Sequence, residues 1–248
     1  MQSASVKPRH VLCFLGKDDK LLHPPKAMAK TIADFGFEID RLYSQARPDP
    51  SMERSFGICW DRVFPLAWSD ADEAAVAKHK SVLYVLGPPM EQPKAVAYSA
   101  AALQIVDEMI DAGAIAVKGE SAGVAHGLER WRSLADQARK GATTSQGLAV
   151  TSAVAKACRL AFAKRPLGGD RYFETVGYHL VGLPEIYVAK SRGNDWSAVM
   201  LMEEIANAMA EHGIEATLRD RKLELSRETS YAEGDFKFNP YGIVRIEA

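Results

Sequence analysis

Residues 119–123 read Gly-Glu-Ser-Ala-Gly and match the G-x-S-x-G pattern that surrounds the nucleophile of α/β-hydrolases. In those enzymes the motif forms a sharp turn from a strand into a helix. Its glycines are needed because the turn is strained and the helix passes close by. The sequence predicts a strand over residues 114–117 and a helix over residues 127–139, as such a turn requires. Ser121 is therefore a candidate nucleophile.

A triad would need an acid and a histidine after Ser121 in the sequence, and Asp170 or Asp195 with His179 or His212 supply that order. The pair Ser121 and His179 defines the hydrolase hypothesis. Against it, Lys118 ends the strand where an apolar residue is usual, and no His-Gly-Gly-Gly segment supplies a second oxyanion donor. The favoured interpretation is a structural turn in which Ser121 caps the following helix.

Two polar segments, residues 120–126 and 174–179, share one order of residue types: acid, hydroxyl, small apolar, glycine, and then histidine. Short polar clusters on a rigid scaffold often form sites. If the two segments are neighbours, their glutamates and histidines could bind a metal or perform acid–base chemistry. The predicted binding residues are Glu120, His126, Glu174, Thr175 and Glu185.

Structural roles compete with that site. Glu120 and Ser121 can cap a helix, and Thr175 and His179 can lie on one face of a strand. Because no denser ligand pattern is present, the sequence predicts no metal centre. No dinucleotide fingerprint, phosphate-binding loop or EF-hand loop occurs, so no cofactor is predicted either.

Apolar periodicity and glycine or proline punctuation divide the chain into short elements. Helices are predicted over 24–35, 69–79, 93–112, 127–139 and 196–211. Strands are predicted over 10–16, 37–43, 56–63, 81–86, 114–117, 172–181, 185–189, 214–218, 222–226 and 241–247. The apolar stretch 148–162 is assigned as a helix to residue 157 followed by a strand.

These elements predict an α+β fold, in which a mixed or antiparallel sheet is flanked by helices. Helix, glycine, then strand recurs along the chain, which suggests two related subdomains. The small polar stretch 141–147 marks the boundary between an N-terminal α/β subdomain, residues 1–142, and a C-terminal α+β domain, residues 148–248. The two halves could also pack as one unit.

The composition excludes several functions. The 248 residues carry 31 basic and 32 acidic side chains, a net charge of -1, which gives no footprint for nucleic acid or an anionic membrane. Cys13, Cys59 and Cys158 are odd in number and include no Cys-x-x-Cys pair, so buried thiols in a reducing compartment are expected. With neither a signal peptide nor a membrane span, a cytoplasmic protein is expected.

Residues 175–185 read Thr-Val-Gly-Tyr-His-Leu-Val-Gly-Leu-Pro-Glu, with a helix predicted soon after them. From about residue 172 to 246 the sequence resembles a C-terminal domain found in many bacterial proteins and classed as of unknown function. The resemblance implies no established activity, and in the relatives the position of Ser121 need not be serine. It implies a domain signature of Thr175, Gly177, Gly182, Leu183, Pro184 and Glu185.

The leading functional hypothesis is a non-catalytic cytosolic binding or regulatory protein of bacterial type, with its site between residues 120–126 and 174–179. Its partner would be an unknown protein or small molecule, neither nucleic acid nor membrane, and a homo-oligomer is compatible with the sequence. A serine hydrolase of the esterase type is the alternative. A metal-dependent enzyme using Glu120, His126, His179 and Glu185 is the third hypothesis.

Overall fold

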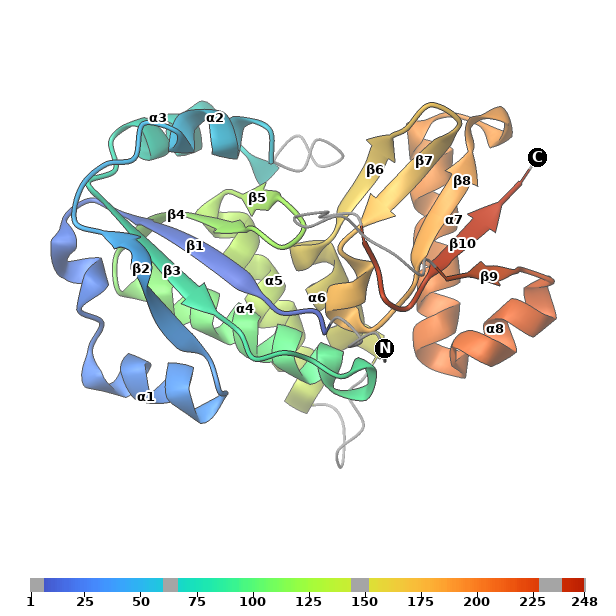
Figure 1. Ribbon diagram of the computed structural model, residues 1–248, viewed down its shortest axis with the longest axis horizontal. Coiled ribbons are helices and arrows are strands. Elements are labelled where there is room, and N and C mark those ends of the chain that lie inside the picture. The colour runs from blue at the N-terminus through green and yellow to red at the C-terminus, as the bar shows by residue number, and fades with distance from the viewer. Residues whose placement is uncertain (1–6, 60–66, 144–151, 228–237, 248) are drawn as a thin grey trace, which may run out of the picture.

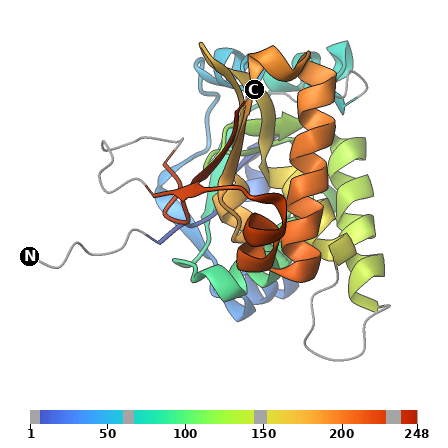
Figure 2. The same ribbon diagram turned by 90° about the vertical axis from the view of Figure 1, so that its right-hand side faces the viewer.

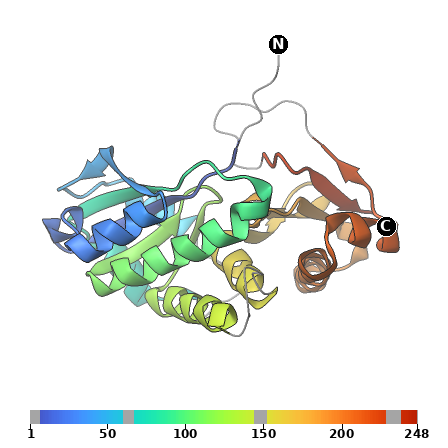
Figure 3. The same cartoon turned by 90° about the horizontal axis from the view of Figure 1, so that it is seen from below.

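The computed structural model describes residues 7–59, 67–143, 152–227 and 238–247. These residues form two five-stranded sheets that lie side by side, with the long helices packed on one common side (Figure 1; Figure 3). The strand order is β2-β3-β1-β4-β5 in sheet A and β6-β7-β8-β10-β9 in sheet B. Two antiparallel or mixed sheets flanked by helices confirm the predicted α+β class.

Sheet A is antiparallel at every described strand pair. Its strands are β1 (Val11–Gly16), β2 (Glu38–Gln45), β3 (Ser81–Leu86), β4 (Ala114–Gly119) and β5 (Val124–His126). The central strand β1 is buried on both faces because alternate residues point to opposite sides of a strand. Leu12 and Phe14 pack on the inner face, whereas Cys13 and Leu15 pack on the outer face.

Helices cover both faces of sheet A. The inner face carries α1 (Lys26–Asp34), α4 (Ala95–Asp111) and α5 (Leu128–Thr143). The outer face carries the shorter α2 (Met52–Gly57) and α3 (Asp70–Ala77). Ser69 caps α3 through a capping box with Asp72, which confirms the predicted helix start.

Sheet B has one parallel pair, β8 with β10, and is otherwise antiparallel. Its strands are β6 (Lys164–Gly168), β7 (Tyr172–Val176), β8 (Glu185–Ala189), β9 (Leu225–Ser226) and β10 (Ile243–Ile246). The long helix α7 (Asp195–His212) runs along one face of this sheet, with α8 (Ile214–Arg221) beside one end of it (Figure 2). Ile186 and Val188 of β8 point to the α7 side and are buried.

Helix α6 (Ser152–Phe162) lies between the two sheets and contacts α4, α5 and α7. Its fully buried Arg159 joins α7 through Glu203 Oε2 at 2.8 Å and Asn207 Oδ1 at 2.7 Å. One apolar core runs from β1 through α6 to β8 and β10. The division at residues 141–147 stays a prediction, and residues 144–147 lie outside the described part.

Several element predictions are wrong. Residues 214–218 belong to helix α8, because Ile214 and Leu218 stand four apart and suit a helical face as well as a strand. Helix α6 continues to Phe162 in place of the strand predicted after residue 157, and residues 148–151 of the helix predicted up to residue 157 lie outside the described part. The strand predicted over 172–181 ends at residue 176, where the 3₁₀ helix η4 (Tyr178–Val181) follows.

The strand predicted over 56–63 begins inside α2, whose Met52 and Phe56 bury a helical face. Residues 60–63 of that prediction lie outside the described part. Of the strand predicted over 222–226, only residues 225–226 pair with β10. Among the described helices, none is both long and apolar enough to cross a bilayer.

Candidate functional site

Residues 119–123 form the tight end of a β-hairpin between β4 and β5. Gly123, at φ 62°, adopts the left-handed conformation, and its N–H donates to the Glu120 carbonyl at 3.1 Å. Helix α5 begins only at Leu128, because residues 124–126 first pair back with β4. The strand and the helix predicted on either side of the motif are confirmed, but β5 stands between them, so the direct strand-to-helix turn of the hydrolase hypothesis is absent from this hairpin.

The Ser121 hydroxyl ties this hairpin to the chain at the start of β1. Its Oγ donates to the Arg9 carbonyl at 2.8 Å and accepts from the Val11 N–H at 2.9 Å. The Glu120 N–H also donates to the Val11 carbonyl at 2.8 Å. The side chain thus continues the ladder between β1 and β4 past its last pair. The prediction that Ser121 caps the next helix is wrong.

Glu120 lies on the outer face of sheet A in a small polar cluster. Its Oε1 is 2.8 Å from Lys118 Nζ and 3.4 Å from the Tyr84 hydroxyl. Lys118 is 1% exposed, donates to Ser55 Oγ, and places its Nζ 5.2 Å from the Phe56 ring centroid. This ion pair explains why a lysine stands near the end of a buried strand. The Glu120 side chain remains 29% exposed.

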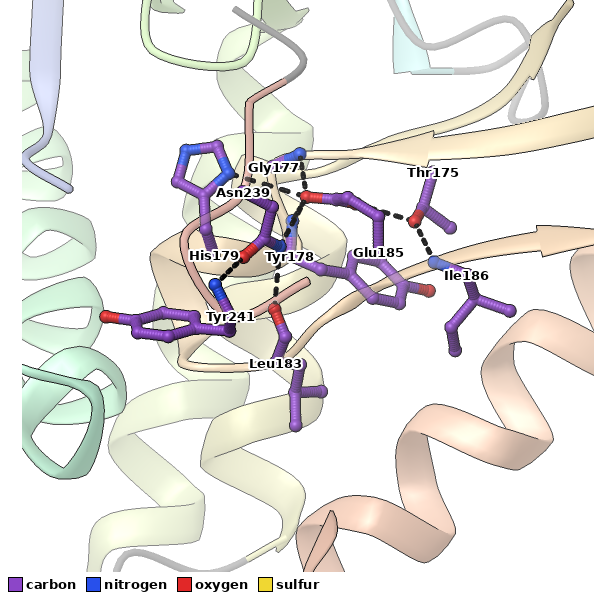
Figure 4. Close-up of polar contacts among 9 residues, drawn as sticks. All are labelled: Thr175, Gly177, Tyr178, His179, Leu183, Glu185, Ile186, Asn239 and Tyr241. Atoms are coloured by element: carbon purple, nitrogen blue, oxygen red, sulfur yellow. Dashed lines mark hydrogen bonds and ion pairs between the residues drawn. The ribbon is translucent and has the colours of Figure 1, made fainter. Parts of the chain in front are cut away.

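Glu185 is the hub of a buried hydrogen-bond network at the start of β8 (Figure 4). Its Oε2 accepts from Thr175 Oγ1 at 2.6 Å, and its Oε1 accepts from the backbone N–H groups of Gly177 at 3.1 Å and Tyr178 at 3.0 Å. Asn239 Nδ2 donates to the same Oε1 at 3.0 Å. His179 Nδ1 lies 3.4 Å from it, a longer contact. The structure thus brings Thr175, His179 and Glu185 together.

The network holds three segments of sheet B in register. Thr175 Oγ1 accepts from the Ile186 N–H at 2.8 Å, which links β7 to β8 beyond their backbone pairs. Asn239 also donates to the Leu183 carbonyl at 2.9 Å and accepts from the Tyr241 N–H at 2.8 Å. With both carboxylate oxygens of Glu185 engaged, the network acts as an internal anchor.

The other predicted residues stand apart from this hub. His126 is fully buried, and its Nε2 carries the proton because its partner at 3.1 Å is the Ala161 carbonyl, which only accepts. Its ring packs edge-on against Trp131, with centroids 4.8 Å apart. Glu174 lies on β7 opposite Tyr187 of β8. His126 therefore joins β5 to α6, and Glu174 belongs to sheet B.

The two segments that share an order of residue types, 120–126 and 174–179, are nevertheless neighbours. A β-carbon placed on Gly177 would lie 2.6 Å from the Ala122 Cβ and 2.6 Å from the Phe162 carbonyl oxygen. Gly177 has φ 104°, so both its space and its conformation require glycine. At the other end of η4, Gln92 Nε2 donates to the Gly182 carbonyl at 2.8 Å. The glycines of the signature thus dock sheet B onto sheet A.

A second link at this junction runs through a buried histidine. Ser99 of α4 donates to the Leu180 carbonyl at 2.6 Å, so its oxygen accepts from His10 Nε2 at 2.8 Å. The His10 ring packs edge-on against Phe162, with centroids 4.5 Å apart. Burial, together with the nearby His179, lowers the pKa of His10 from 6.5 to about 3. His10 is therefore neutral at physiological pH.

The described residues offer neither a group of side chains that could ligate a metal nor, at Cys13 and Cys158, a thiolate at neutral pH. In residues 7–59, 67–143, 152–227 and 238–247, His, Cys, Asp and Glu do not gather in groups of three or more that could hold a metal ion. The three cysteines are buried, as predicted, and none forms a disulfide with another described residue. Burial raises the pKa of Cys13 and of Cys158 to about 12, so neither is a thiolate at neutral pH.

Sequence reasoning missed Asn239, His10 and Ser99, which complete the network and the junction. Asn239 stands 54 residues from Glu185 in the chain, and Ser99 stands 89 residues from His10, so local spacing gives no signal. The sequence noted Lys118 only as an anomaly at a strand end. A buried charge in an apolar strand is the one signal that pointed to its partner Glu120.

Comparison of the chain with protein-family models, with curated proteins and with solved structures found no match. The functional assignment therefore depends on the geometry of the two loops and of the surrounding surface.

Proposed function

We propose that this protein is a non-catalytic module that binds a small molecule. In this proposal the loop at residues 175–185 serves as a rigid junction between the two sheets. The observation that carries this proposal is the engagement of the polar atoms that sequence analysis singled out. Ser121 Oγ has two backbone partners, and the Glu185 carboxylate has donors on both oxygens. A catalytic serine needs a base within about 2.6–3.2 Å of its hydroxyl, and the hydrogen bonds of Ser121 go to backbone groups.

Rigid docking of the two sheets suits binding more than a mobile catalytic lid. Gly177 against Ala122, and Gly182 against Gln92, leave the junction closely packed. This packing favours a ligand site away from the two loops. Pockets lined by described residues open between α1 and α4, between sheet B and the start of α7, and between α2 and α3, with volumes of about 560, 220 and 200 Å³.

The cellular setting belongs to the same proposal. Three buried cysteines with no disulfide among the described residues support a reducing compartment, which is the cytoplasm in our proposal. Trp196 and Met200, one helical turn apart on α7, are 62% and 55% exposed and support contact with a second copy of the chain.

A labelling experiment combined with a ligand screen tests the proposal. We expect a fluorophosphonate probe to label the folded protein no more than its Ser121→Ala variant. We expect at least one class among amines, carboxylates, phosphates and sugars to raise the melting temperature in a concentration-dependent way. Binding at a hundredfold excess over Kd stabilises a protein by about 2.7 kcal/mol. Stoichiometric labelling that depends on Ser121, or a panel in which no class stabilises, would overturn the proposal.

A further inference from the structure

Helices α1 and α4 lie side by side on the inner face of sheet A (Figure 3), and a groove of about 560 Å³ opens where α1 ends and α4 begins. This volume falls within the roughly 300–1,000 Å³ of pockets that bind small molecules. Phe35 and Tyr98 contribute partly buried aromatic rings to the lining. Ala97 is exposed and has a small side chain, so it leaves room for an apolar group in the groove.

The α4 side of the groove carries a positive charge. Lys94 directly precedes α4 and Tyr98 follows four residues later, so the two side chains lie on the same face of the helix. Within the described residues, Lys94 forms no ion pair and the Tyr98 hydroxyl has no hydrogen-bond partner. An ammonium group and a phenolic O–H are both donors, so together they suit a carboxylate.

The α1 side of the groove supplies acceptors. Asp34, the last residue of α1, pairs through its Oδ2 with Lys30, one helical turn earlier. No described residue bonds to its Oδ1, and no described N–H donates to the carbonyl of Asp34 or of Phe35. The C-terminal end of a helix also carries a partial negative charge. These oxygens suit an ammonium group, which has three N–H donors.

The two sides of the groove carry opposite charges that do not neutralise each other. Asp34 pairs with Lys30 and not with Lys94, although Asp34 and Lys94 line the same groove. A ligand that is only an anion would be repelled by Asp34, and a ligand that is only a cation would be repelled by Lys94. A ligand that carries both charges avoids both penalties.

We infer that this groove binds a free α-amino acid with a large apolar side chain. The carboxylate of the ligand lies at Lys94 and Tyr98, and its ammonium group lies at Asp34. Its side chain packs against the ring of Phe35 and over Ala97. This inference rests on the proposed binding function and names the site and the ligand class.

Isothermal titration calorimetry of the full chain with L-phenylalanine, at neutral pH and low salt, tests the inference. We expect saturable binding at one site. The two parts of the ligand can be removed one at a time, since 3-phenylpropionate lacks the ammonium group and phenethylamine lacks the carboxylate. Each of these analogues should bind at least tenfold more weakly than L-phenylalanine.

Variants on the two sides of the groove should match these analogues. Lys94→Gln should weaken L-phenylalanine binding about five- to tenfold and leave the affinity for phenethylamine undiminished. Asp34→Asn should weaken L-phenylalanine binding by a similar factor and leave the affinity for 3-phenylpropionate undiminished. Ala97→Phe should abolish binding, because the new ring would occupy the groove. Lys78→Gln, which removes the same charge from an exposed site beyond the end of α3, should leave all affinities unchanged.

Equal affinity for L-phenylalanine and both analogues, or a Lys94→Gln/Asp34→Asn double variant that binds L-phenylalanine as the parent does, would overturn the inference. So would the absence of saturable heat with both L-phenylalanine and L-leucine. Amino acids fall within the amine and carboxylate classes of the thermal panel. If the two amino acids fail while some class in that panel stabilises the protein, the ligand class is wrong and the binding function stands. If no class stabilises the protein, both fail.

Discussion

The hairpin at residues 119–123 and the loop at residues 175–185 use a glutamate in opposite ways. Glu120, in the hairpin between β4 and β5, is 29% exposed and is neutralised by Lys118. Glu185, which follows the Gly177 loop, is 1% exposed, and its firm hydrogen bonds come from a hydroxyl, two backbone N–H groups and an amide. A carboxylate without a cation must find several donors when it is buried.

The difference explains the glycines in each segment. Gly123 serves a hairpin turn, and among the described residues a β-carbon there would meet only Cys59 Sγ at 3.6 Å. Gly177 lets the backbone approach both the Glu185 carboxylate and the neighbouring sheet. The same residue type therefore shapes a local turn in one loop and permits docking between sheets in the other.

Alanine at the two glycines gives the sharpest test of this comparison. Gly177→Ala should lower the free energy of unfolding by about 4 kcal/mol, since it adds strain at positive φ to a clash with Ala122 and the Phe162 carbonyl. Gly123→Ala should cost only about 1 kcal/mol, from its left-handed conformation alone. Urea denaturation of both variants measures the difference, and equal losses would contradict the docking role of Gly177.

The two acids provide the next test. Glu185→Gln should cost about 3 kcal/mol, because the amide NH₂ group must face either Thr175 or the backbone donors of the loop. Glu120→Gln should cost about 1 kcal/mol, because the side chain is partly exposed and the amide oxygen of glutamine can still accept from Lys118. The exposed Glu247→Gln serves as a control in the same urea series. A larger loss at Glu120 than at Glu185 would reverse the comparison.

Much of the fold could be predicted because strong local signals were present. Helices α1 and α4 lie within their predicted ranges, and α7 exceeds its predicted range by one residue at each end; all three ranges are bounded by proline, glycine or a capping residue. The strand prediction for residues 214–218 was wrong because one turn of helix and a short strand have similar apolar patterns. The prediction for helix α6 was wrong at its C-terminal end because a continuous apolar run has no period that distinguishes a helix from a strand.

The site was less predictable, for a physical reason. Thr175 and Glu185 were grouped through the resemblance of their segment to a known signature, and the structure brings them into contact. The donors from Gly177 and Tyr178 are backbone N–H groups, and residue types do not indicate which backbone groups will bond to a given side chain. Ser121 likewise bonds to backbone atoms of Arg9 and Val11, more than a hundred positions away.

Acid should loosen the junction between the two loops through His10. Its pKa is about 3 in the folded protein against an ordinary 6.5, so the unfolded chain binds the proton more tightly. The stability that neutral His10 permits is complete above pH 6.5 and falls as the pH drops towards 3, by about 1.4 kcal/mol per pH unit. Between pH 6.5 and 5 this loss amounts to about 2 kcal/mol.

His10→Gln isolates that contribution from the titration of the carboxylates, because glutamine keeps a donor for Ser99 and has no charge to gain. The free energy of unfolding of the variant, measured by urea denaturation at several pH values, should decline less steeply below pH 6.5 than that of the parent. Parallel curves of the free energy of unfolding against pH for the two proteins would show that His10 takes up no proton when the protein unfolds.

The smallest predicted loss of stability is that of a substitution at Ser121. It distinguishes the two loops by the hydrogen-exchange rate of one backbone amide in each. Ser121→Ala removes the bonds to the Arg9 carbonyl and the Val11 N–H at the open edge of the ladder, where water can partly replace them. The loss should be about 1 kcal/mol. Native-state hydrogen exchange should show faster exchange at the Val11 amide, while the Tyr178 amide, which donates to Glu185, stays protected. If the Val11 amide keeps its protection in Ser121→Ala, the serine does not extend the β1–β4 ladder and its hydroxyl needs another role.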